Sequence, residues 1–164
     1  MREGIGWKVD GPMQWLGTAY RPVALVARDS HEIGESIGSA ALSGNYAVTA
    51  LDFNATLAAA DAKISNLRIS HASTAIAING RTGHELKHLQ IVNCTTGIAT
   101  TSATFYLGNA LFSGVTTGFN CTGSTATAEH VTASTRRDHR GRYLSLGWSN
   151  GRIEAGPGPI GRWV

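Results

Sequence analysis

The residues with the most evident chemistry are His84, Glu85 and His88, which match the H-E-x-x-H pattern of zinc peptidases. On a helix the two histidines share a face and bind one zinc ion, while the glutamate activates a zinc-bound water. The surrounding sequence instead favours extended backbone, on which the two imidazoles do not converge. Cys94 also stands where the longer metzincin pattern requires a histidine. We therefore expect a surface turn here, and we assign neither a metal nor any other cofactor.

Carboxylates that could act on a glycosidic bond are sparse in the middle of the chain. Asp52 and Asp61 are the only acids between Glu35 and Glu85. Glycoside hydrolysis needs two carboxylates roughly 5–10 Å apart. A lyase of the pectate type needs an acid cluster for calcium and a basic residue that takes a proton. Because the sequence shows no clustered acids on neighbouring repeats, we expect Asp52 and Asp61 to be loop or capping residues and assign no catalytic residue.

The two cysteines do not form a recognisable framework. Cys94 aligns with Ala72 and Val115, which indicates a small apolar core or turn residue. Cys121 lies two residues beyond Phe119, at a different place in its repeat. Two cysteines provide neither a disulfide scaffold nor a zinc ribbon, and these two can pair only if their offsets converge.

Most of these residues lie in a repeat of about 21 residues, which is the strongest pattern in the sequence. Its copies begin 22, 21 and 21 residues apart. Within each copy apolar residues recur at every second position, which is the period of a β-strand. Three short strands per repeat describe one coil of a parallel β-helix, in which equivalent side chains stack about 4.8 Å apart. The copies begin at Asn66, His88, Asn109 and His130.

The apolar positions of the repeat form columns that we expect to point into a tube. Leu89 and Ile91 should be interior, while Gln90 between them should be exposed. A single coil cannot bury its inner face, whereas stacked coils can. The columns are Leu67/Leu89/Ala110/Val131, Ile69/Ile91/Phe112/Ala133, Ile64/Leu86/Leu107/Ala128 and Ile76/Ile98/Phe119.

A leucine-rich repeat is the competing solenoid of similar length. It requires L-x-x-L-x-L followed by an asparagine column. The stretch Leu86-x-x-Leu89-x-Ile91 fits the first part. The second part fails, because the corresponding column contains His71, Asn93 and Gly114. We therefore predict an all-β fold with a parallel β-helix.

The flanking sequence adds a resemblance to a known group of proteins. Gly17-Thr18 and Pro22-Val23-x-Leu25 precede a polar, acidic loop from Asp29 to Glu35, and coils such as Ile64-x-Asn66-Leu67-x-Ile69 follow. This succession, over about residues 14–134, resembles the right-handed parallel β-helix modules of large secreted or surface-anchored bacterial proteins, related to the pectate-lyase-like superfamily. The resemblance implies a right-handed coil. It also implies either a passenger or stalk segment or an enzyme acting on polysaccharide.

Charge divides the chain into unequal parts. Residues 1–134 carry eight Lys/Arg and nine Asp/Glu, a net charge of −1, whereas residues 135–164 carry six arginines and two acids, a net charge of +4. We expect an N-terminal segment at 1–13, the β-helix at 14–134 and a basic, Gly/Pro-rich tail at 135–164, poorly ordered apart from residues 142–149. The body gives no electrostatic reason to expect nucleic acid. No apolar run approaches a membrane span.

We also expect the chain to be a piece of a longer protein, because its first residues lack the pattern of a signal peptide. Its last coil, near Val131 and Ala133, would then be open and able to self-associate.

These observations favour a non-catalytic structural or binding module of a secreted or cell-surface protein that contacts polysaccharide. A polysaccharide lyase or glycoside hydrolase on the same scaffold is the alternative, and a zinc peptidase is a distant third. The repeat-start residues and the threonine rows could present a polar face to sugars, or could form hydrogen-bonded ladders that satisfy turn backbone. The candidate ligand-binding residues are Asn66, His88, Asn109 and His130, and the threonine rows are Thr95, Thr96, Thr116 and Thr117.

Overall fold

A computed structural model describes residues 6–9, 13, 15, 17–33, 41–53, 61–134, 145–154 and 162–163. Within these ranges every regular element is a β-strand. No helix long and apolar enough to cross a membrane occurs in this part of the chain. The strands are β1 (Trp7–Val9), β2 (Val23–Leu25), β3 (Ala47–Phe53), β4 (Lys63–Ser70), β5 (Ala72–Asn79), β6 (Thr82–Val92), β7 (Thr96–Thr101), β8 (Thr104–Ser113), β9 (Thr117–Thr122), β10 (Thr125–Ser134), β11 (Ser145–Glu154) and β12 (Arg162–Trp163).

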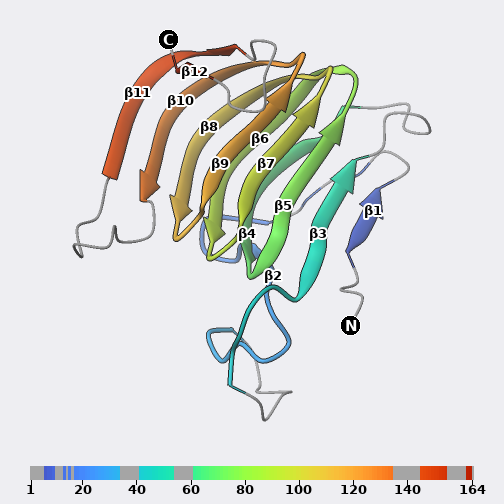
Figure 1. The fold of residues 1–164 in the computed structure, drawn as a ribbon, viewed down its shortest axis with the longest axis vertical. Helices are drawn as coiled ribbons and strands as arrows, with labels where there is room; N and C mark the ends of the chain where they lie inside the picture. The colour runs from blue at the N-terminus through green and yellow to red at the C-terminus, as the bar shows by residue number, and fades with distance from the viewer. Residues whose placement is uncertain are drawn as a thin grey trace.

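The strands form two sheets whose members alternate along the chain (Figure 1). The first sheet has the order β1-β3-β5-β7-β9 and is parallel throughout. In the second sheet β2, β4, β6, β8 and β10 are parallel, and β11 and β12 follow in antiparallel pairing. Because successive strands pass from one sheet to the other, the chain winds as a β-solenoid of about four turns. The predicted all-β parallel solenoid is therefore confirmed.

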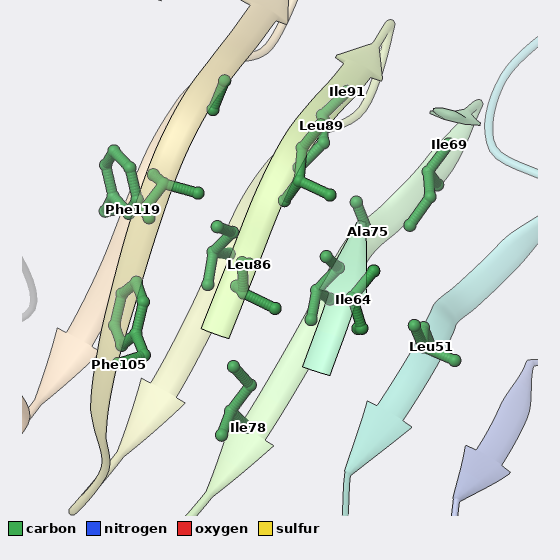
Figure 2. Packing of buried hydrophobic residues seen from close by; sticks show 14 of the residues in the cluster. Leu51, Ile64, Ile69, Ala75, Ile78, Leu86, Leu89, Ile91, Phe105 and Phe119 are labelled. Carbon is green, nitrogen blue, oxygen red and sulfur yellow. The ribbon is translucent and has the colours of Figure 1, made fainter. Parts of the chain in front are cut away.

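The strand register reproduces the repeat. Leu67 pairs with Leu89, Leu89 with Ala110 and Ala110 with Val131, which are steps of 22, 21 and 21 residues. The other predicted columns also stack, and their side chains point into the space between the sheets (Figure 2). Leu89 and Ile91 are buried and Gln90 is exposed, as predicted. Each fully buried aliphatic side chain contributes about 1.5–3 kcal/mol, so the stacked columns supply the main stabilisation of the fold.

Each coil turns at corners whose residues have positive φ. The first corner contains the repeat starts Asn66, His88, Asn109 and His130, with φ between 51° and 54°. Asparagine, histidine and glycine tolerate this left-handed conformation better than β-branched residues do. The backbone ladder continues past the first corner, since only the corner residue is skipped in the pairing. Two of the three short strands expected per coil therefore join into one long bent strand.

The second corner of each coil contains the column that lacks the regular asparagines of a leucine-rich repeat. His71, Asn93 and Gly114 have φ of 59°, 52° and 65°. Their common property is tolerance of the left-handed conformation, because glycine lacks a Cβ and a short polar side chain bonds locally. The described coils contain strands and turns only, so the alternative solenoid is excluded.

Strands from outside residues 14–134 pair with both ends of the solenoid. β1 lies within residues 1–13 and pairs with β3. β11 lies within residues 135–164 and pairs antiparallel with β10 from Thr125 to Ser134. The edge of β10 that we expected to be open is thus hydrogen-bonded to a strand of the same chain. β12 pairs in turn with β11, and the remainder of the expected tail lies outside the described residues.

Candidate functional site

Long polar and aromatic side chains gather on the outer face of the second sheet, where β6, β8 and β10 lie side by side. Four residues define this group, which we call the Tyr106 cluster: Glu85, Lys87, Tyr106 and Glu129. They come from three successive coils. Glu85 pairs in register with Tyr106, while Lys87 and Glu129 pair with the two sides of Gly108. The stacking of coils, not proximity in sequence, brings them together.

The members of the Tyr106 cluster form one connected chain of contacts. The Tyr106 hydroxyl donates a hydrogen bond of 2.9 Å to Oε2 of Glu129. The Lys87 ammonium lies 5.5 Å from the centre of the Tyr106 ring, within the range of a cation–π contact. Lys87 also forms an ion pair with Glu85. The half-buried Tyr106 ring on β8 thus contacts Lys87 of β6 through its face and Glu129 of β10 through its hydroxyl.

Gly108 provides the space that the ring needs. A Cβ at this position would lie 2.9 Å from Cε1 and from the hydroxyl oxygen of Tyr106. Any side chain there would therefore displace the tyrosine. Gly108 is itself buried, so the ring covers the backbone of β8 and lies along the sheet.

The electrostatics of the cluster keep its groups in defined protonation states. The hydrogen bond with Lys87 lowers the pKa of Glu85, and the same bond raises the pKa of Lys87. The hydrogen bond to Glu129 raises the pKa of Tyr106, with the nearby negative charge acting in the same direction. At neutral pH Glu85 is therefore ionised, Lys87 is charged and Tyr106 is a hydrogen-bond donor.

The predicted ligand-binding column lies directly beside the cluster. His88, Asn109 and His130 follow Lys87, Gly108 and Glu129 in the chain and are exposed. Asn109 donates a hydrogen bond of 2.8 Å to Nδ1 of His88. Asn66, the fourth member, is half-buried and donates to the carbonyl oxygen of Gly17 at 3.0 Å. The column therefore contains three exposed residues and one that attaches the N-terminal part of the chain. Their role in ligand binding stays a prediction.

The H-E-x-x-H residues are dispersed by the extended backbone of β6. His84 is buried in the interior; its Nδ1 accepts a hydrogen bond of 3.0 Å from the Ala62 amide, and its Nε2 lies 3.2 Å from the Gly80 carbonyl oxygen. Glu85 pairs with Lys87, and His88 lies at the first corner. The expected surface turn is thus wrong for His84, which occupies an interior column in register with Phe105. No group of three or more His, Cys, Asp or Glu residues suited to a metal ion occurs among the described residues.

The remaining acids and cysteines do not join the site. Asp52 lies within β3 and not in a loop, whereas Asp61 precedes β4. Cys94 and Cys121 are both free and buried, and burial raises the pKa of each thiol. Cys94 receives a 3.5 Å hydrogen bond from the Ala72 amide, which supports the predicted small core or turn role. A buried thiol with a raised pKa is a poor nucleophile.

Sequence reasoning missed the gathering of acids around Tyr106. We considered only acids on neighbouring coils, whereas Glu85 and Glu129 lie two strands apart, on β6 and β10, and are linked through Tyr106 on β8 between them. The available signal was the repeat itself: steps of 21 residues lead from 85 to 106, from 87 to 108 and from 108 to 129. Applying the period to polar residues as well as apolar ones would have assembled this group.

No family model, curated protein or solved structure matches this sequence. The assignment of a function therefore depends on the fold and on the geometry of the outer face.

Proposed function

We propose that the protein is a non-catalytic β-solenoid module that binds polysaccharide through the Tyr106 cluster and the adjoining corner residues. The observation that carries this proposal is the Tyr106 ring, which lies along the sheet over Gly108 with charged groups on either side. A sugar ring has an apolar C–H face and a rim of hydroxyls. An aromatic ring beside hydrogen-bonding groups complements both features.

The geometry of the solenoid suits an extended ligand. Adjacent strands lie about 4.8 Å apart, so β6, β8 and β10 span on the order of 10 Å. His88, Asn109 and His130 run parallel to the cluster across the same strands and add exposed hydrogen-bonding groups. A chain of sugars lying across the strands would meet a member of the cluster and a polar corner residue at each of these three coils. The resemblance to β-helix modules related to the pectate-lyase-like superfamily supports placing this module in a secreted or cell-surface protein.

A polysaccharide lyase or glycoside hydrolase is the second candidate, favoured by two carboxylates near one tyrosine. A general acid, however, needs a raised pKa, whereas the contact with Lys87 lowers the pKa of Glu85. The raised pKa of Tyr106 likewise disfavours a phenolate base. The pKa shifts of Glu85 and Tyr106 therefore disfavour these two residues as acid and base and support binding.

Affinity electrophoresis on gels containing soluble polysaccharides tests the proposal. The panel includes neutral glucans and acidic polygalacturonate, and the variants are Tyr106→Ala and the matched control Tyr20→Ala, a tyrosine that is 97% exposed in a distant turn. We expect at least one polysaccharide to retard the wild-type protein. Tyr106→Ala should weaken binding about tenfold, which corresponds to ~1.4 kcal/mol, and Tyr20→Ala should leave it unchanged.

Two results would overturn this function. The first is the absence of retardation by any polysaccharide, or unchanged retardation of a folded Tyr106→Ala protein. The second is release of reducing ends or unsaturated sugars by the wild type but not by Glu129→Gln, which would favour the enzyme.

A further inference from the structure

A cavity of about 360 Å³ lies at the second corner, away from the Tyr106 cluster. Residues of the segment 42–45 form one wall, and the stacked corners of successive coils form the other. The cavity is polar, and its hydrogen-bonding lining comes from both walls. The lining residues used below are Asn45, His71, Asn93, Thr95, Gly114 and Thr116.

The corner wall of this cavity has a left-handed backbone. His71, Asn93 and Gly114 occupy equivalent positions with positive φ. A Cβ at Gly114 would lie only 2.5 Å from Oδ1 of Asn93. Glycine therefore satisfies the backbone conformation and also leaves room beside the Asn93 amide.

The other wall is held in place by hydrogen bonds to two coils. The Asn45 side-chain amide donates to Oγ of Ser73 at 3.1 Å and to Oγ1 of Thr95 at 3.0 Å. The Tyr46 amide donates to the His71 carbonyl oxygen at 2.7 Å. Thr116 occupies the next place in the Ser73/Thr95 column and lines the cavity. Its hydroxyl has no side-chain partner among the described residues, so it remains available to a ligand.

The chemistry of the lining is neutral. Among the described residues that line the cavity, none is Asp, Glu, Lys or Arg. Burial lowers the pKa of His71; the negative charge of Glu32 opposes this effect and the positive charge of Arg68 reinforces it. The imidazole is therefore uncharged at neutral pH. Amides and hydroxyls supply both donors and acceptors, whereas nothing in the lining would balance a charged ligand.

We infer that this cavity binds a single neutral sugar unit, held by the Asn93 amide and the Thr116 hydroxyl. The two N–H groups of the Asn45 amide bind Ser73 and Thr95, so Asn45 contributes its side-chain oxygen as an acceptor. Its volume is that of a small-ligand pocket, and its lining matches a ring of hydroxyl groups. The unit can be a free monosaccharide or the terminal residue of a chain, since both present the same hydroxyls. The site shares no residue with the Tyr106 cluster and does not depend on the function proposed for it.

An NMR titration of the intact protein tests this inference. The probes are D-glucose, D-galactose and N-acetyl-D-glucosamine, with D-galacturonate as the charged comparator. We expect at least one neutral sugar to shift the amide signals of Gly44, Gly114 and Thr116 saturably, with a Kd in the millimolar range. Galacturonate should bind at least about tenfold more weakly. A disaccharide that binds more tightly than its monosaccharide would identify a chain end as the ligand.

Matched variants connect the binding to the cavity. Thr116→Val removes the hydroxyl with little change in shape and should weaken binding about fivefold, while Thr116→Ser should restore it. Thr122→Val, at an exposed threonine that ends β9, and Tyr106→Ala should have no effect on this site. The inference is overturned if no neutral sugar shifts these signals at roughly 100 mM, if galacturonate binds equally well, or if folded Thr116→Val binds like the wild type.

Discussion

The outer faces of the two sheets rest on the same core but differ in chemistry. On β5, β7 and β9 the first sheet presents short uncharged residues in register: Ala77, Ala99 and Asn120 in one row, and Asn79, Thr101 and Thr122 in the next. We call these six residues the neutral face. The first row continues onto β3 and β1 with the charged residues Asp52 and Lys8. The second sheet presents the Tyr106 cluster at the equivalent level of the coils. Both faces have parallel ladders behind them, so the backbone does not require the difference.

This contrast shows which outer residues the fold needs and which it does not. The neutral face demonstrates that alanine, threonine and asparagine suffice on the outside of a coil. Two further threonines, Thr96 and Thr117, form a half-buried ladder with Thr74, and belong to the structural part of the threonine rows. The fold therefore does not explain a connected group of charged and aromatic side chains on the second sheet. The proposed contact with polysaccharide would explain it.

The largest expected effect tests whether the two faces share one core. Ile91 in the second sheet and Ile98 in the first are both fully buried. Replacing either with aspartate places an unpaired charge in the interior and should lower the free energy of unfolding by about 3–5 kcal/mol. Urea denaturation followed by circular dichroism measures this loss.

The matched controls lie on the outer faces beside these isoleucines. Gln90→Lys and Ala99→Lys should each change stability by no more than about 0.5 kcal/mol. If an outer substitution costs as much as its interior neighbour, the assignment of inner and outer positions is wrong.

A smaller effect separates the structural and binding roles of the first corner. Asn109 has φ of 51°, where a β-branched residue is strained. Asn109→Val should destabilise the protein by roughly 1–2 kcal/mol, whereas Asn109→Gly should be nearly neutral in a thermal unfolding experiment. If the corner residues also bind ligand, Asn109→Gly should weaken polysaccharide binding in a protein of unchanged stability. Unchanged binding would mean that the first-corner residues have a structural role only.

The smallest effect concerns the titration of Tyr106. Glu129 accepts its hydrogen bond and places a negative charge beside the phenol, so the folded protein holds this proton to a higher pH than an isolated tyrosine does. The resulting stabilisation is fully present below the ordinary tyrosine pKa and is lost as the pH rises through the raised value. Glu129→Gln should shift the pKa of Tyr106 downward.

NMR of the Tyr106 ring signals during a pH titration measures this change, and Tyr20 is the internal control because its turn lies far from Glu129. A Tyr106 pKa that is the same in both proteins would mean that the hydrogen bond is not formed in solution.

Much of the architecture follows from the sequence by itself. The apolar alternation at period two and the recurrence at about 21 residues specify strands and coils, because they are local and repeated four times. The positions of the first and second corners are also visible, since asparagine, histidine and glycine recur there at positive φ. The turns at Arg81 and Ser102 also have positive φ, and the residue type does not reveal them. These properties depend on backbone preference and burial. Each coil carries the corresponding residues in its own sequence, so they can be recognised one coil at a time.

Which side chains meet on the outer surface was decided only by the tertiary structure. Glu85 and Glu129 are 44 residues apart in the chain, yet both lie beside Tyr106 because three coils stack in register. Likewise β11 runs antiparallel to β10, and the segment around Asn45 bridges two coils to form a cavity. Such contacts join residues with no local pattern in common, and they exist only once the ladders have fixed the spacing and phase of every coil.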